Sequence, residues 1–275
     1  MSFVVRGMYP INMAAIVHDR AGAESPDGDD LPAEVRAYRA EYRAKELGPH
    51  YRGWLHFAFT TGGSLLAITF FATRVHDASL AEWGIVPIAF FVANLAEYLG
   101  HKGPMHRPRR GLKILFVRHT QQHHHYFTHD AMAYTSSRDF KMVLFPPVML
   151  FFFLGVIATP LSLVLRLVFT PNVGWLFAAT GVAYFLTYEW LHFVYHLDES
   201  SKIGGHPLFR RLRALHQTHH DKRLMGKWNF NITFPICDFL FGTRYVPPAS
   251  GCAAAASRTS HDAPRPAPKR TRARR

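Results

Sequence analysis

The sequence predicts an all-α integral membrane protein with about four transmembrane helices and a histidine-rich cap on the cytoplasmic side. The chain has 275 residues, and its apolar residues gather in four blocks that carry no charged side chain. A helix of about 20 mostly apolar residues can cross a bilayer. Lysines and arginines lie between the blocks, and 13 of the 18 histidines lie between His101 and His220. None of these histidines falls in the middle of a block.

The elements are expected in the following order. Residues 1–50 predict a flexible leader and then a charged surface helix at 34–47, which approaches the membrane. Residues 51–248 predict one membrane-embedded domain. Within it the predicted spans are residues 53–73, 83–100, 142–169 and 174–196.

The block at residues 142–169 has two possible forms, because its prolines Pro146, Pro147 and Pro160 permit either one kinked span or a re-entrant hairpin. Segments 102–141 and 197–248 hold eight lysines or arginines each, whereas the connections at 74–82 and 166–173 hold one each. Cytoplasmic loops carry the excess of these residues. Four spans put both basic segments, the histidines and both termini on that side, so four spans are predicted.

The net charge of +13 has a simple origin. Residues 249–275 hold seven basic residues and one acidic residue, and their Ala, Arg, Pro and Ser content is typical of a disordered basic tail. Anionic lipid headgroups are the expected partner of such a tail, and nucleic acid is not. The two cysteines, Cys237 and Cys252, disfavour a disulfide framework, a four-cysteine zinc site and an iron–sulfur cluster.

Four histidine clusters meet at one membrane face if there are four spans. They read EYLGHKGPMH, HTQQHHH, EWLHFVYH and HQTHH. His192 and His196 are four residues apart, so both imidazoles project from one helix face. Imidazole binds iron, zinc, copper and nickel, so the clusters predict a metal site without naming the metal. The isolated histidines are expected to be ordinary polar residues: His18, His50, His56, His76, His206 and His261.

The run at residues 119–125 leaves one assignment open. Helical spacing pairs His119 with His123, one turn apart, but it does not separate His124 from His125, because i+5 and i+6 both point away from that stripe. His129 is expected to be solvated or to support a ligand. Three carboxylates near the clusters could either hydrogen-bond a ligating imidazole or extend to the membrane interface: Glu97, Glu189 and Asp221.

Together the clusters resemble the histidine boxes of the fatty acid hydroxylase and sterol desaturase superfamily of membrane di-iron oxygenases. The four boxes correspond to HxxxxH, HxxxHH, HxxxH and HxxHH, and NFNITFPICDFLFGT resembles the closing segment, with Cys237 where the family often has Trp. The resemblance covers about residues 89–243 and is strongest, in the first box, to fatty acid 2-hydroxylases. It favours His124 over His125 and implies ten metal ligands: His101, His106, His119, His123, His124, His192, His196, His216, His219 and His220.

The resemblance also implies a reaction, namely O2-dependent hydroxylation or desaturation of a lipid, with a fatty acyl chain as the first expectation. The implied cofactors are two iron ions, with zinc possible in the isolated protein. Because no cytochrome b5 module is recognised, the resemblance implies a separate electron donor, such as cytochrome b5, ferredoxin or a reductase.

Two alternatives stay open. A sterol or carotenoid hydroxylase or desaturase would share the boxes. A divalent-metal transporter or metal-binding membrane protein is the alternative from another class, although transporters place their ligands near the bilayer midplane, where these spans have none.

Overall fold

The computed structural model describes residues 27–28 and 31–247, and the regular secondary structure of these residues is helical. Within the described part of the chain, β pairing is limited to one isolated bridge between Thr128 and Ala131. The predicted disordered tail at 249–275 and most of the predicted leader lie outside the described residues. The all-α prediction is confirmed for the part that the structure describes.

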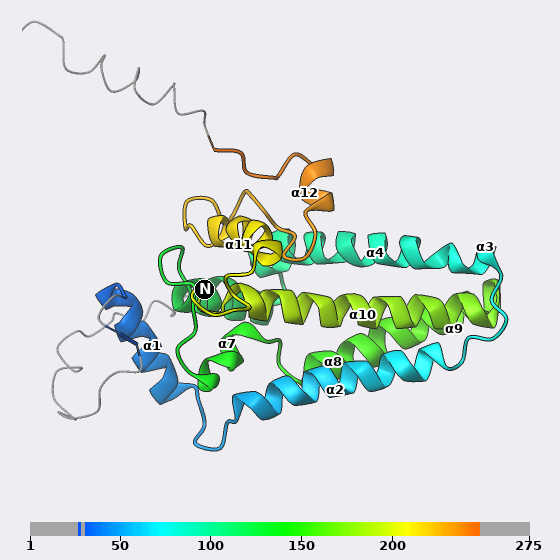
Figure 1. Cartoon of the computed structure of the whole chain (residues 1–275), viewed down its shortest axis with the longest axis horizontal. Helices are drawn as coiled ribbons and strands as arrows, with labels where there is room; N and C mark the ends of the chain where they lie inside the picture. The colour runs from blue at the N-terminus through cyan, green and yellow to red at the C-terminus, as the bar shows by residue number, and fades with distance from the viewer. Residues whose placement is uncertain (1–26, 29–30, 248–275) are drawn as a thin grey trace, which may run out of the picture.

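Four long helical rods run side by side and form the body of the molecule (Figure 1). The rod that contains α10 contacts each of the other three. It therefore lies among the other three predicted spans, and it supplies most of the buried apolar residues of the bundle. The rods are α2 (Gly53–Ala72), α4 (Ile85–Gly100, preceded by α3, Leu80–Trp83), the series α8 (Val148–Phe152), η5 (Phe153–Ala158) and α9 (Thr159–Val168), and α10 (Pro171–Tyr195).

Three helical stretches of the described residues are long and apolar enough to cross a membrane: Gly53–Ala72, Leu80–Met105 and Ser137–Val168. Their outer faces expose large apolar side chains such as Leu66 and Leu167, as expected of surfaces that contact lipid. The 25-residue α10 is buried on more sides, between the other rods. The chain is an integral membrane protein, and the count of four spans stays a prediction.

Residues 148–168 of the block at 142–169 form one rod and not a hairpin. Pro146 and Pro147 lie in the turn before α8, and Pro160 occupies the first turn of α9. Because η5 runs directly into α9, Pro160 lies inside a continuous rod, where it removes one backbone N–H donor. The π-helical segment η5 precedes this proline and provides the local break that a proline requires.

Shorter elements close one end of the bundle and form the cap. This is the end at which α4 and α10 finish, so it receives the histidines that follow both helices (Figure 1). The cap contains α1 (Ala33–Lys45), η2 (His101–Met105), α5 (Lys113–Phe116), η3 (Val117–His123), α6 (His124–Tyr126), η4 (Ser137–Asp139), α7 (Phe140–Val143), α11 (Pro207–His219) and α12 (Ile236–Leu240).

The predicted surface helix is α1, and it is attached to the cap by buried charges. Arg39 is completely buried, and its guanidinium donates to the carbonyls of Tyr126 and Ala131, both at 2.9 Å. It also pairs with Asp27 at 3.2 Å. Burying a charge is costly unless it is paired and hydrogen-bonded, and here both conditions are met. The charge pattern of α1 alone could not reveal this docking.

Candidate metal centre

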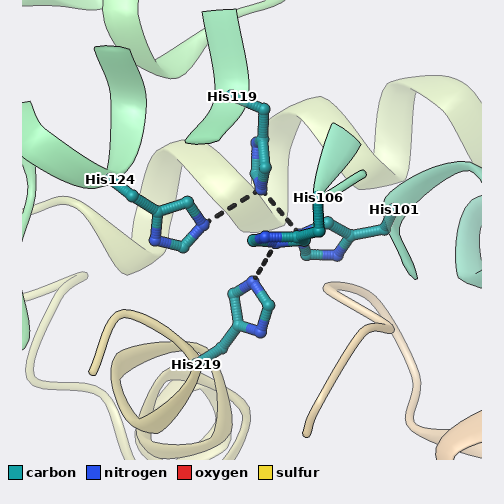
Figure 2. Close-up of side chains that lie close together, drawn as sticks. All are labelled: His101, His106, His119, His124 and His219. Carbon is teal, nitrogen blue, oxygen red and sulfur yellow. Dashed lines mark hydrogen bonds between the residues drawn. The ribbon is translucent and has the colours of Figure 1, made fainter. Parts of the chain in front are cut away.

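Ten histidines converge in the cap. Nine of them form two groups, cluster A and cluster B. Within each cluster, the ring nitrogens all lie within 4.8 Å of one another. Cluster A, drawn in Figure 2, contains His101, His106, His119, His124 and His219. Cluster B contains His123, His196, His216 and His220, and His192 adjoins it, with its Nε2 atom 3.3 Å from that of His196. These ten are the residues that the sequence singles out.

The Nε2 atoms of cluster A point toward one another (Figure 2). Those of His101 and His119 are 2.7 Å apart, and those of His106 and His219 are 2.9 Å apart. The clusters are neighbours, because the ring of His124 in cluster A lies 4.3 Å, centroid to centroid, from the ring of His220 in cluster B. The arrangement is a pair of adjacent, all-imidazole sites.

Backbone carbonyls fix the orientation of five of these rings. A carbonyl oxygen can only accept, so the Nδ1 atom that faces it carries the proton, and the Nε2 lone pair is left free. A free lone pair directed inward is the form in which imidazole binds a metal. The Nδ1 donors and their acceptors are His101 to Phe230 (2.5 Å), His123 to Met142 (2.8 Å), His196 to Met132 (2.7 Å), His219 to Trp228 (2.8 Å) and His220 to Phe127 (2.8 Å).

The ring of His123 has one such free lone pair. The Nε2 atom of His123 is buried and has no hydrogen-bond partner. A buried polar atom without a partner is costly, and several lone pairs that face one another are stabilised only when a cation lies among them. The donor set therefore fits a metal ion in each cluster.

A π-helical segment explains why His119 and His124 share cluster A. In a π-helix, hydrogen bonds join residues five apart, so such residues lie on one face. His119 and His124 are five apart across η3, where the His124 amide donates to the His119 carbonyl. His101 and His106 lie on either side of a kink at Gly103 in η2, and the His106 amide donates to the Gly103 carbonyl. The pairing of His119 with His123, predicted from α-helical spacing, is corrected, because His123 belongs to cluster B.

The same geometry separates His124 from His125. His124 is completely buried in cluster A. His125 is exposed, its Nδ1 lies 3.3 Å from the Thr120 carbonyl, and its ring faces Tyr38. His129 is also exposed and pairs with Asp130 at 2.9 Å.

We expect His124→Ala to lose bound metal and His125→Ala to keep it. The first change removes an inward-facing nitrogen that lies 3.0 Å from Nε2 of His119, whereas the second removes a ring outside both clusters. Metal per chain, measured by inductively coupled plasma mass spectrometry on the purified variants, decides between them. Equal loss from the two variants would show that the assignment is wrong.

Burial lowers the pKa of His106, His123 and His219, and repulsion between rings that would both be protonated lowers that of His106 and His123 further. The pKa of His106 falls to about 2. The pKa of His219 falls to about 4 through burial, and that of His123 also falls to about 4. The rings therefore stay neutral, and able to bind metal, well below the pH at which free histidine is protonated.

These pKa values predict that the metal-free protein is destabilised by acid. Histidine in the unfolded chain binds a proton below about pH 6.5, whereas these rings in the folded protein do not, so stability falls as pH falls from about 6.5 toward 4. Each such ring contributes about 1.4 kcal/mol per pH unit in that window. Thermal unfolding of the metal-free protein at pH 7.5 and pH 5.5 should show a marked drop in midpoint. An unchanged midpoint would contradict the pKa shifts.

Two of the three predicted carboxylates act on the clusters through the backbone. Glu97 accepts from the Tyr184 hydroxyl at 2.5 Å and from the Thr233 amide at 3.0 Å, and also from the Ile232 amide. It thereby holds the segment whose Phe230 carbonyl orients His101. The carboxylate contacts the support of an imidazole and not the imidazole itself.

Glu189 has the same relation to cluster B. It accepts from the Phe145 amide at 3.2 Å, at the end of the segment whose Met142 carbonyl orients His123. Asp221 has a different role, because it forms an ion pair with the exposed Arg223 at 2.6 Å. The Arg223 guanidinium and amide lower the pKa of Asp221 to about 2.

Sequence reasoning missed one further support. Asp238 is buried and accepts from the amides of Phe230 and Asn231 at 2.9 and 2.7 Å. It holds the same segment as Glu97, from the other side. Its signal in the sequence is its place in ICDFL, within the closing segment. The carbonyl acceptors themselves have no signal, since every residue has one.

Comparisons with known proteins agree with this geometry. The model of the fatty acid hydroxylase family matches residues 86–243, a range that contains all ten histidines. Among solved structures, the chain is similar to one described as full-length Scs7p with only the hydroxylase domain visible. The TM-score is 0.52 and the identity is 20%, over 70% of this chain and 68% of that one, so this likeness concerns the fold. No curated protein matches the sequence.

Proposed function

Because the chain belongs to the fatty acid hydroxylase family, we propose that it is a membrane-bound di-iron oxygenase that hydroxylates a fatty acyl chain. The reaction would use O2 and electrons from a separate donor, such as cytochrome b5, ferredoxin or a reductase. The family gives the coarser class, a membrane hydroxylase of lipids. The observation that supports a di-iron centre is the pair of adjacent imidazole clusters.

The donor set suits two metal ions held without carboxylates. Cluster A would hold one ion and cluster B, with His192, the other. Neutral imidazole suits iron and also zinc, which could occupy the isolated protein. Iron bound there would activate O2, which is the oxidant, for reaction at a C–H bond. The chain itself contributes the oriented lone pairs and the buried surroundings.

An apolar cavity of about 360 Å³ supports a lipid chain as the substrate. It lies between α4, α10 and the η5–α9 rod, and its lining includes Val92, Phe153 and Phe185. Along α4 it extends from Ala89 to His101, which is about 18 Å at the rise of an α-helix. One end therefore meets cluster A. A chain in this cavity would be separated from water and would present a carbon to the metal centre.

The position of the clusters also supports an enzyme over a transporter. Both clusters lie in the cap, at one end of the bundle, and not midway along the rods. We place the cap and both termini on the cytoplasmic side, because the basic segments adjoin it. A sterol or carotenoid substrate, or desaturation in place of hydroxylation, would use the same clusters and is distinguished by product analysis.

The test is incorporation of labelled oxygen. Membranes that contain the protein, given ¹⁸O2, a reducing system and a mixed lipid extract, should yield a lipid with one added ¹⁸O atom, detected by mass spectrometry. Comparison of cells with and without the protein would identify the lipid class. Metal analysis should return about two ions per chain, one for each cluster. Unlabelled product, or protein that binds no metal when supplied with iron, would overturn the proposal.

A further inference from the structure

A second cavity, of about 550 Å³, lies outside the metal centre at the N-terminal end of α2. Its apolar side is formed by Leu55, Phe59 and Pro147. Leu55 and Phe59 are exposed. Two of its wall residues are fixed by hydrogen bonds, because the Tyr51 hydroxyl donates to Nδ1 of His56 at 2.8 Å, and Nε2 of that ring lies 2.9 Å from a carbonyl oxygen. The cavity is thus shaped by the protein itself.

Three cations line the polar side of this cavity: Arg52, Arg118 and Lys141. Arg118 donates to the backbone carbonyl of Lys141 at 3.0 Å, and Lys141 donates to the carbonyl of Glu46 at 2.5 Å. Carbonyl oxygens carry no full charge, and none of the described residues that line the cavity is acidic. The cavity therefore has an excess of positive charge.

The place of the cavity in the fold corresponds to the expected depth of lipid headgroups. The cavity adjoins the first residues of Gly53–Ala72, the first stretch that is able to cross a membrane. Trp54, which precedes the wall residue Leu55, is 62% exposed. Tryptophan and basic side chains at the end of an apolar helix are typical of the membrane interface. An occupant would be both charged and amphipathic.

We infer that this cavity binds one anionic phospholipid. The phosphate is held by Arg52, Arg118 and Lys141, and the first part of an acyl chain lies on Leu55 and Phe59. The inference is independent of the hydroxylation proposal. It rests on charge complementarity, on the apolar surface beside the cations and on the depth of the cavity.

Native mass spectrometry of the purified full-length protein tests this inference. The probes are phosphatidylglycerol and phosphatidylcholine with the same acyl chains, and inorganic phosphate. We expect retention of one phosphatidylglycerol molecule in preference to phosphatidylcholine, and no comparable retention of phosphate. Arg52→Gln should weaken phosphatidylglycerol binding about fivefold, the effect of losing about 1 kcal/mol from one basic residue.

Matched variants separate the site from general charge. Arg52→Lys keeps the charge and should keep the lipid, and Lys202→Gln removes an exposed cation of the cap away from the cavity and should also keep it. Arg118→Gln should also lower phosphatidylglycerol binding. If the Arg118→Gln protein does not fold, the result for Arg52→Gln decides the test. Equal retention of the two lipids, phosphate binding as tight as lipid binding, or normal binding by Arg52→Gln would overturn the inference.

Discussion

Replacing His219 with alanine is expected to remove the metal of cluster A and to abolish hydroxylation. The ring is completely buried, its Nε2 lies 2.9 Å from that of His106, and its Nδ1 donates to the Trp228 carbonyl. Loss of a partner that merely orients a ligand already costs 10–100-fold in metal affinity or activity, so loss of the ligand should cost more than about a hundredfold. Metal per chain should fall from about two ions to about one.

The corresponding change in cluster B is His196→Ala. It should remove the other metal and abolish turnover as well, because the proposed chemistry needs both sites. His129→Ala is the matched control, since its ring is exposed and pairs only with the neighbouring Asp130 among its described ion pairs. Product formation from ¹⁸O2 and metal content are measured on the same preparations. A His219→Ala protein with two metal ions and full turnover would show that cluster A is not the reaction site.

Much of this architecture is predictable because the bilayer limits what a sequence can do. A block of about 20 apolar residues without charge is most stable as a helix that crosses the lipid bilayer. The predicted span at residues 53–73 therefore corresponds closely to α2 (Gly53–Ala72). Histidines that follow the C-terminal ends of spans two and four must meet at one face, because alternate spans of a four-span protein run in the same direction. That constraint brings His101 and His196 into one cap without any knowledge of the loops.

The internal arrangement of the cap was not predictable from spacing. Periodicity assumes an α-helix, and the π-helical segment η3 replaces the pair His119 and His123 by the pair His119 and His124. A π-helix has no clear composition signal, and long-range packing maintains it. The assignment of His124 over His125 came from the family resemblance, and burial gives it a physical reason. The docking of Arg39 was hidden because its acceptors are backbone atoms of a distant segment.

Replacing Glu97 with alanine is expected to lower the metal affinity of cluster A by 10–100-fold, the range measured for partners that orient ligands. One carboxylate oxygen accepts from the amides of Ile232 and Thr233, and the other accepts from the hydroxyls of Tyr184 and Thr233. Alanine leaves these donors without a partner, at about 1–3 kcal/mol for each one that stays buried. The segment that presents the Phe230 carbonyl to His101 then loses its anchor.

Glu97→Gln should behave differently and shows whether positioning is the cause. The glutamine carbonyl can still accept from the two amides, and its amino group can donate to the hydroxyl oxygens, which accept as well as donate. Glu97→Gln should therefore retain most of the metal affinity that Glu97→Ala loses.

The two carboxylates provide a crossed test, because Glu97 supports cluster A and Glu189 supports cluster B through the Phe145 amide. Metal competition with a chelator should resolve two binding steps. Glu97→Ala should weaken one step and Glu189→Ala the other, whereas general destabilisation would weaken both together. Equal weakening of both steps by either variant would contradict the positioning role. The two steps are assigned with His219→Ala and His196→Ala, each of which removes one of them.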